Sequence, residues 1–484
     1  MPGVADPQCS RAMNPISHKV MRAWADLGPG FLPFADAATA DVPLSRLLRL
    51  SLFQVSVGMA MVLIVGTLNR VMIVELGVAA SVVAVMISLP VLYAPFRTLV
   101  GFRSDTHRSA LGWKRVPFIW MGTMLQFGGL AIMPFALLVL SGGGNAAAWP
   151  SWIGPLCAGL AFLLVGAGLH TIQTAGLALA TDLVPAESRP TVVGLMYVML
   201  LLGTVVSAVI FGVLLVDFSP GRLVQVIQGA AVTTIVLNIV ALWKQETRRP
   251  PRNNGAASVP RPSFREAWGR FIAGDHAMRR LVAIVLGTIA FTMQDVLLEP
   301  YGGQVLGMTV AQTTLLTATL AAGGLFGFAF ASRTLSRGAD PFRMAVAAAL
   351  VGIPAFGIVI LAGPLQSLPL FVGGVFLLGF GGGVFGHGTL TASMSLAPRD
   401  QVGLALGAWG AAQATAAGVG VALGGIIRDL VAAVAGREML GPALTGPATG
   451  YTAVYCIEIA LLLATVVVML PLVGGKRNVS FAGS

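Results

Sequence analysis

Long apolar runs alternate with short polar stretches along most of this chain. From residue 50 onward there are twelve such runs, each approaching the roughly 20 residues that a membrane-spanning helix needs. They lie near residues 50–70, 78–98, 116–140, 152–181, 191–216, 223–243, 281–300, 310–332, 344–362, 368–396, 402–427 and 451–473. The pattern predicts an all-α integral membrane protein with 12 transmembrane helices.

The composition also indicates a membrane protein. The chain of 484 residues is 56% hydrophobic and only 10% charged, whereas about a quarter of the residues of a soluble domain are charged. The formal net charge is +11, but no soluble basic domain accompanies it, so we expect no nucleic-acid partner. The three cysteines lie far apart without a CxxC motif, which argues against a disulfide framework and against a metal cluster.

The distribution of Lys and Arg orients the predicted helices in the lipid bilayer. If the loops are assigned alternately to the two sides, all but four of the 30 Lys and Arg residues fall on one side. The exceptions are Arg70, Arg222, Arg428 and Arg437. By the positive-inside rule the basic side is cytoplasmic, so both termini are expected in the cytoplasm.

Residues 1–45 form a polar segment ahead of the first apolar run, which we expect on the cytoplasmic side. Apolar residues recur in it at helical spacing, at Ile16, Val20, Met21, Trp24 and Leu27. That spacing suits an interfacial helix on the membrane surface. A flexible tail is the equally open alternative.

The longest loop, residues 244–280, is basic and divides the apolar runs six and six. We therefore expect an N-terminal six-helix half at residues 46–243 and a C-terminal six-helix half at residues 281–473. The loop between them is a cytoplasmic linker, and residues 474–484 are a cytoplasmic tail.

Two short patterns recur at equivalent places in the two halves. Residues 69–77 resemble residues 294–302, and residues 183–195 resemble residues 396–404. Parallel repeats of this kind are typical of the major-facilitator architecture. The repeats predict a major-facilitator-like fold.

The loop between the second and third runs resembles the major-facilitator pattern of glycine, aspartate and basic residues. Its residues are Gly101, Arg103, Asp105, Gly112, Lys114 and Arg115. In that superfamily the basic residues hold neighbouring helix ends through charge–dipole contacts. We expect the same role here.

Signatures of catalysis are missing from the sequence. No histidine is followed by glutamate, so there is no HExxH motif. Residues 474–477 lack the Ser/Thr and the spacing of a P-loop, and the GxGxxG pattern at 381–386 lies in an apolar run with no strand before it. We therefore expect no enzyme activity and no nucleotide cofactor.

Glycines cluster around His387 in the tenth run, among them Gly383 and Gly386. Small residues let helices pack closely, and they could also form a shallow wall for a large flat ligand. His387 could then supply an axial imidazole to a metal at the centre of that ligand, and His170 is the other histidine inside an apolar run. A hydrogen-bonded structural role is the commoner alternative for a lone intramembrane histidine.

Polar residues also end the first and seventh runs, where hydrocarbon is expected: Arg70, Glu75, Gln294, Asp295 and Glu299. An ionisable side chain at this depth costs a few kcal/mol or more, so it usually has a partner or a function. Arg70 and Asp295 occupy nearly matching positions, and we expect an ion pair between them that locks the outer ends of the two halves. Proton coupling or gating is the alternative, and Glu458 in the twelfth run has no assigned role.

Longer strings resemble the PucC/LhaA family, the bacteriochlorophyll delivery group of the major facilitator superfamily. They are residues 47–58 (LLRLSLFQVSVG), 66–76 (GTLNRVMIVEL), 103–113 (RSDTHRSALGW), 126–136 (QFGGLAIMPFA) and 294–302 (QDVLLEPYG). The resemblance extends to the end of the last run, and residues 31–38 (FLPFADAA) favour the LhaA branch, whose members act on the core antenna.

This resemblance implies a function that pattern and composition do not. Members of the family belong to the inner (cytoplasmic or intracytoplasmic) membrane of phototrophic bacteria. They are needed to assemble light-harvesting complexes and are thought to deliver bacteriochlorophyll to antenna polypeptides, to chaperone those polypeptides, or both. The implied partners are the antenna polypeptides, with the core antenna favoured, together with bacteriochlorophyll synthase and membrane insertion machinery.

We therefore expect an assembly factor that binds bacteriochlorophyll transiently, or antenna helices on its lipid-facing surface. The alternative is a proton-coupled secondary transporter of a small solute. A transporter usually places charges along several helices that face its cavity. Here charges are almost confined to the ends of the runs, which favours the assembly factor.

Overall fold

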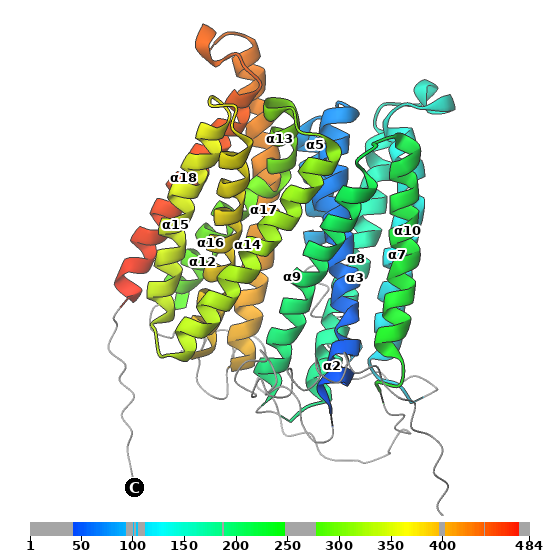
Figure 1. Cartoon of the computed structure of the whole chain (residues 1–484), viewed down its shortest axis with the longest axis vertical. Helices are drawn as coiled ribbons and strands as arrows, with labels where there is room; N and C mark the ends of the chain where they lie inside the picture. Colours follow the sequence, from blue (N-terminus) through cyan, green and yellow to red (C-terminus); the bar gives the residue numbers. More distant parts are fainter. Residues whose placement is uncertain are drawn as a thin grey trace, which may run out of the picture.

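The structure is a computed structural model that describes residues 42–92, 100, 103–104, 112–185, 188–246, 277–395, 402–439 and 441–473. In this part of the chain long helices lie side by side and run between the two ends of a bundle (Figure 1). Eleven of the described helices are long and apolar enough to cross a membrane, which confirms the all-α membrane fold. Helices are the expected form because a backbone in lipid must satisfy its hydrogen bonds internally.

We call the described chain before residue 247 the N-terminal half. Its first membrane helix runs from Leu44 to Glu75 and includes two π-helical segments. The elements of this helix are α2 (Leu44–Leu50), α3 (Leu52–Met61), η2 (Val62–Thr67), α4 (Leu68–Arg70) and η3 (Val71–Glu75). The helices that follow are α5 (Ala80–Leu92), α7 (Val116–Leu140), α8 (Ile153–Asp182), α9 (Arg189–Leu214) and α10 (Pro220–Leu242).

We call the described chain after residue 276 the C-terminal half. It begins with α12 (Ala277–Thr292), which passes through the 3-10 turn η6 (Met293–Val296) into α13 (Leu298–Leu306). The remaining long helices are α14 (Val310–Ser336), α15 (Pro341–Ala362), α16 (Leu368–Ser395), α17 (Val402–Gly436) and α18 (Ala448–Met469).

Two of the predicted runs differ from the observed helices. The first helix begins at Leu44 rather than near residue 50, and the seventh run is broken at residues 293–297. The second run forms α5, a helix of 13 residues that contains Pro90, and its continuation through residues 93–99 lies outside the described residues. The count of twelve spans therefore stays a prediction.

The predicted interfacial helix and the C-terminal tail lie outside the described residues, as does the linker between residues 246 and 277. The expected boundaries of these segments remain predictions.

The two halves meet along two helix pairs, α9 with α14 and α5 with α17. Glycines make this approach possible. A Cβ atom added at Gly425 would lie 2.6 Å from the backbone oxygen of Ala80, and one at Gly212 would lie 2.9 Å from the side chain of Leu315. Small residues let helix backbones come together where lipid offers no hydrophobic driving force. We call this contact between the halves the seam.

Polar contacts hold the end of the bundle at which α2 lies, the lower end in Figure 1. Arg46 of α2 donates from Nε to Oε1 of Gln245 at 3.1 Å and from Nη2 to the backbone oxygen of Gln245 at 2.7 Å. Because the loops at this end carry most of the Lys and Arg residues, we call it the basic end and the opposite end the outer end.

Candidate functional site

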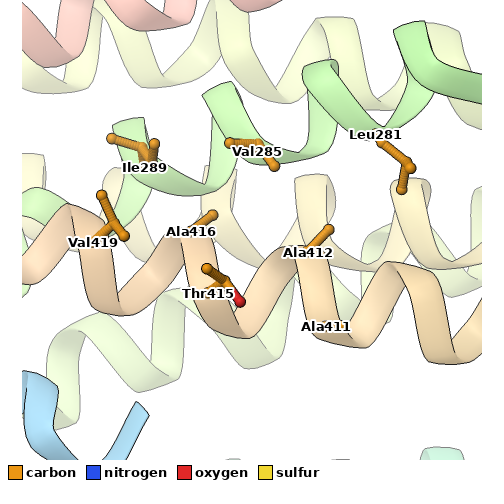
Figure 2. Close-up of a pocket in the computed structure, with 8 residues that line it drawn as sticks. All are labelled: Leu281, Val285, Ile289, Ala411, Ala412, Thr415, Ala416 and Val419. Atoms are coloured by element: carbon orange, nitrogen blue, oxygen red, sulfur yellow. The ribbon is translucent and has the colours of Figure 1, made fainter. Parts of the chain in front are cut away.

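A crevice of about 360 Å³ lies between α12 and α17. Figure 2 shows side chains from the two helices pointing toward one another across it. They are Leu281, Val285 and Ile289 of α12, and Ala412, Ala416 and Val419 of α17. Thr415 supplies the polar side chain of a lining that is otherwise aliphatic.

The crevice forms because α12 and α17 touch around Gly420 and Gly424 and diverge from there toward the basic end (Figure 2). At the closed end, a Cβ atom added at Gly420 would lie 3.2 Å from the backbone oxygen of Ile289, and one at Gly424 would collide with the backbone of Met293. Nearer the basic end, the branched side chains of α12 face small side chains on α17. The arrangement gives a wedge-shaped apolar space between two membrane helices.

The break after α12 places polar groups at the seam. Pro300 lies in the first turn of α13, and in an uninterrupted helix its ring would clash with the carbonyl group of Val296. The break leaves that carbonyl group free, and it accepts a hydrogen bond of 3.0 Å from Nδ2 of Asn69 in the other half. One proline in the sequence therefore creates an acceptor for the opposite half.

Arg70 forms its ion pair with Glu75 of the same half, so the expected pair between Arg70 and Asp295 is wrong. The reason is the π-helical segment η3. Residues five apart lie about 140° apart around an α-helix, but a π-helix brings residues i and i+5 together. Arg70 still contacts the C-terminal half, because its Nη2 donates to the backbone oxygen of Met308 at 3.2 Å.

Three acidic residues of the C-terminal half lie where α18 crosses the break: Asp295, Glu299 and Glu458. Glu299 is buried, and its Oε1 accepts a hydrogen bond of 2.9 Å from Thr317. Glu458 of α18 is fully buried, and Asp295 lies close enough to interact with the charges of both glutamates. Gln294 is buried with its Nε2 donating to the backbone oxygen of Phe291 at 3.2 Å.

Sequence reasoning missed that Glu458 belongs with this group. The signal was present in the spacing of Tyr451, Tyr455 and Glu458, which places three polar side chains on one face of α18. All three are completely buried, so this face points into the bundle.

A second polar group, at the outer end, was also missed. Arg428 pairs with Asp429 at 2.8 Å and donates to Oε1 of Gln304 at 2.8 Å. Across the seam, Oδ2 of Asp429 accepts the backbone N–H of Ser81 at 2.6 Å. Ser81 is the second residue of α5, where free backbone N–H groups favour a carboxylate.

His387 lies on the side of α16 that faces α14. Its ring is half-buried, and the ring centroids of His387 and Phe328 are 4.2 Å apart. Nδ1 of His387 is buried and has no hydrogen-bond partner among the described residues. His170 is half-buried on α8. By the predicted count, α8 is the fourth membrane helix and α16, which carries His387, is the tenth.

The two glycines predicted with His387 have different surroundings. Gly383 packs against the backbone of Gly324 on α14, so at this position the glycine serves close helix packing. Gly386 is more open, since a Cβ atom added there would meet only Nε2 of Gln413, at 3.8 Å.

The loop motif gathers three helix ends at the basic end. Arg115 donates from Nε to Asp182, the last residue of α8, at 3.0 Å and from Nη1 to Ser104 at 2.6 Å. The Glu246 carboxylate accepts the backbone N–H groups of Lys114 at 2.6 Å and of Arg115 and Val116. It therefore caps the start of α7.

The other motif residues add less. Lys114 Nζ lies 3.8 Å from Asp182, and Gly112 has a φ of 79°, a conformation that glycine adopts without strain. Arg103 is exposed, and Gly101 and Asp105 lie outside the described residues.

Comparison with known sequences gives one consistent family. The family model described as PUCC protein matches residues 67–477. Protein PucC of Rhodovulum sulfidophilum is 64% identical over 420 residues, covering 87% of this chain and 92% of that protein. Protein PucC of Cereibacter sphaeroides is 56% identical over 462 residues, covering 95% of this chain and 98% of that protein.

A more distant relative is the bacteriochlorophyll synthase 44.5 kDa chain of Rhodobacter capsulatus. It is 29% identical over 393 residues, covering 80% of this chain and 88% of that protein. Three relatives at 55–64% identity are named Protein PucC, and a fourth, at 56%, is described as a protein of the puhA-bchM intergenic region of Rhodobacter capsulatus. None of these names identifies the LhaA branch, so the preference for that branch stays a prediction.

Solved structures of transporters share the fold. A bacterial homologue of the human lysosomal transporter Spinster, in an inward-facing and unoccupied conformation, matches with a TM-score of 0.62 at 15% identity. It covers 88% of this chain and 94% of that chain. At this identity the likeness shows the fold alone, which is major-facilitator-like.

Proposed function

This chain belongs to the PucC protein family, and from that premise we propose that it is an assembly factor for light-harvesting complexes. It catalyses no reaction. It binds bacteriochlorophyll and antenna polypeptides in the inner membrane of a phototrophic bacterium and brings them together. The 29% identical relative, named as a bacteriochlorophyll synthase chain, supports the link to this pigment.

The apolar crevice between α12 and α17 carries this proposal. A site for a polar solute needs several converging hydrogen-bonding groups, whereas this lining offers the hydroxyl group of Thr415. Its volume of about 360 Å³ is at the lower end of the range for ligand sites. A crevice of this size suits an apolar tail or side chain that belongs to a larger partner.

The family supports the proposed partners, and the charges support the proposed orientation. The partners are the antenna polypeptides, with the core antenna favoured, and also bacteriochlorophyll synthase and membrane insertion machinery. The basic end faces the cytoplasm, because loops rich in Lys and Arg stay on that side. The crevice widens toward that end, so the pigment or the polypeptide enters it from the cytoplasmic half of the bilayer.

Bacteriochlorophyll would supply a magnesium ion when bound, and His387 is the side chain that would hold it. Its ring reaches the protein surface in part, and Nδ1 is buried without a hydrogen bond on the described chain. A permanent metal ligand usually donates its other ring N–H to an oxygen atom, which fixes the ring. A histidine without that partner suits a pigment that is held briefly and passed on, and Gly386 leaves space beside it.

The first experiment measures pigment on the purified protein. Membranes of a phototrophic host are solubilised gently, and bacteriochlorophyll absorbance and antenna polypeptides are quantified for each protein molecule. We expect both to co-purify with the wild-type protein. Intact protein that carries neither pigment nor antenna polypeptide would contradict the assembly function.

Substitutions of the two histidines test which of them holds the magnesium of the pigment. His387→Ala should lower bound pigment several-fold at unchanged protein abundance, because the magnesium loses its imidazole. Gln225→Ala, at an exposed position of α10, is the matched control and should bind pigment as the wild type does. Full pigment content in His387→Ala, together with a loss in His170→Ala, would move the ligand to the other half.

The buried carboxyl groups of Glu299 and Glu458 favour a second candidate, a proton-coupled transporter of a small solute. Buried acids in membrane helices are common in proton relays. Reconstituted liposomes with an imposed pH gradient separate the two functions. Solute uptake driven by the gradient, with no pigment or antenna polypeptide on the protein, would favour the transporter.

A further inference from the structure

Buried oxygen atoms without hydrogen-bond partners gather where α18 crosses the break after α12. These oxygen atoms include both carboxyl oxygens of Glu458, Oε2 of Glu299, Oε1 of Gln294 and the hydroxyl group of Tyr455. Glu458 and Tyr455 are 0% exposed, and Glu299 is 4% exposed. Carboxylate and amide oxygens can only accept hydrogen bonds, so the group has too few donors.

These side chains are close enough to influence one another. Asp295 interacts electrostatically with both Glu299 and Glu458, and the backbone N–H of Gln294 lies beside Glu458. The hydroxyl group of Tyr455 lies near Glu458 on the same face of α18. Tyr301 packs edge-on against Tyr455 at 5.7 Å between ring centroids and closes the group on its outer side.

In the part of the chain that the structure describes, the elements packed around Glu458 bring no cation to this group. Arg428 on α17 is engaged by Asp429, by Gln304 and by the ring of Tyr451, which lies 4.7 Å from the guanidinium carbon. In the N-terminal half, Arg70 is held by Glu75.

Besides α17 and α13, whose charged residue is Glu299 itself, the helices that pack against α18 are α12 and α15. Their charged residues, Arg279, Arg280 and Arg343, lie at or next to their basic ends. Among the described residues, therefore, the buried carboxyl groups of Glu299 and Glu458 and the half-buried one of Asp295 have no counter-charge.

If ionised at this depth, the buried carboxylates of Glu299 and Glu458 would each lose several kcal/mol of hydration without compensation, and a charge on the half-buried Asp295 beside them would add to the cost. A metal ion could compensate them, but the described residues contain no cluster of His, Cys, Asp and Glu arranged to hold one. Protons remain, since neighbouring buried carboxyl groups commonly share them. We propose that Asp295, Glu299 and Glu458, with Tyr455, form a proton-binding site of the C-terminal half.

The site is coupled to the seam by direct contacts. Glu299 accepts its hydrogen bond from Thr317, and the hydroxyl group of Thr317 packs directly against Gly66 of the other half. Asp295 precedes Val296, whose carbonyl group binds Asn69. Loss of a proton puts a negative charge beside these contacts, draws water toward it and loosens the seam.

Infrared spectroscopy of the purified full chain tests the site without reference to pigment. Protonated carboxyl groups give a carbonyl band that shifts in D₂O, and this band should decrease as the pH is raised. Glu458→Gln should remove part of the band, and so should Asp295→Asn on a different element. Glu438→Gln, at an exposed position after α17, is the control and should leave it unchanged.

Thermal unfolding against pH gives the second measurement. The neutral form fits the site, so the wild type should lose stability as the pH rises, and Glu458→Gln should flatten this dependence. A band and a pH dependence that survive in both Glu458→Gln and Asp295→Asn would overturn the proposal. So would stabilisation of the wild type by sodium or calcium ions that disappears in Glu458→Gln, because the site would then bind a metal ion.

Discussion

The polar end of the first membrane helix and that of the seventh occupy matching places in the two halves, yet their chemistry differs. In residues 69–75, Arg70 neutralises Glu75, and Asn69 and Arg70 donate hydrogen bonds to the opposite half. In residues 294–299, Asp295 lies near Glu299 and also near Glu458, and the described part of the chain brings no cation to them. The first end therefore presents hydrogen-bond donors that have partners, whereas the second presents carboxyl groups that accept hydrogen bonds.

The comparison shows that the two repeats share an interruption of the helix but differ in the charged side chains that they place there. Both ends interrupt the α-helix, the first by π-helical segments and the second by a 3-10 turn before Pro300. The interruption frees backbone groups and brings polar side chains to the seam. The charges placed on it have diverged, so the first end is suited to holding the halves together and the second to responding to protons.

The largest expected effect is at Glu75. Glu75→Ala leaves the Arg70 guanidinium, which is 5% exposed, without its counter-ion. An unpaired buried charge of this kind costs about 3 kcal/mol. Arg70→Ala should cost less, about 2 kcal/mol, because the side chain of Glu75 is 39% exposed and can be hydrated. Thermal unfolding in detergent checks this order.

Charge exchange tests the pairing at the first end. Arg70→Glu combined with Glu75→Arg should recover part of the stability that either single change loses. Arg70→Asp combined with Asp295→Arg should recover none. Recovery by the second combination would show that Arg70 acts on the seventh helix rather than on Glu75.

An intermediate effect is expected at Asn69. Asn69→Ala removes the donor to the carbonyl group of Val296 and leaves a buried acceptor unpaired, which costs about 1–3 kcal/mol. The loss should appear both in thermal unfolding and as faster labelling of a cysteine placed at Val296. Asn238→Ala is the control, because Asn238 binds Ser56 and Thr123 within the N-terminal half and should destabilise the protein without exposing the seam. Equal labelling in both variants would contradict a role of Asn69 in joining the halves.

The smallest effect is expected at the hydroxyl pair of Thr67 and Thr314, which lie 3.2 Å apart across the seam. Thr67→Val strands one buried hydroxyl group and should cost about 1 kcal/mol, whereas the double change to valine should be nearly neutral. A double-mutant cycle on the unfolding temperature measures the coupling. Additive losses would show that the two hydroxyl groups do not interact.

The sequence predicts the fold well because apolar runs of 20 residues leave a membrane chain few options. It identified the polar residues of the two helix ends as special, but it paired Arg70 with the wrong partner. That error came from matching Arg70 and Asp295 by their places in the two repeats. In α-helical geometry Glu75 points away from Arg70, so the sequence did not suggest the observed partner. A π-helical segment depends on how the whole bundle packs, and no local sequence pattern predicted it.

Glu458 shows a second limit. In the sequence it is one acid in an apolar run, far from any other charge. It acquires neighbours only because α18 crosses the break that Pro300 helps to create, and that crossing is a property of the assembled bundle. The apolar crevice is similar, since its lining resembles any lipid-facing surface until the divergence of α12 and α17 is known.

Most of the hydrogen bonds described across the seam join a side chain of one half to a main-chain group of the other. Asn69 and Arg70 bind the carbonyl groups of Val296 and Met308, and Asp429 binds the amide group of Ser81. A main-chain group looks the same whatever side chain its residue carries. At each of these contacts the hydrogen bond therefore constrains the side chain of one partner only. It requires a particular side chain at positions 69, 70 and 429, whereas at positions 296, 308 and 81 it requires only that the backbone keeps its course.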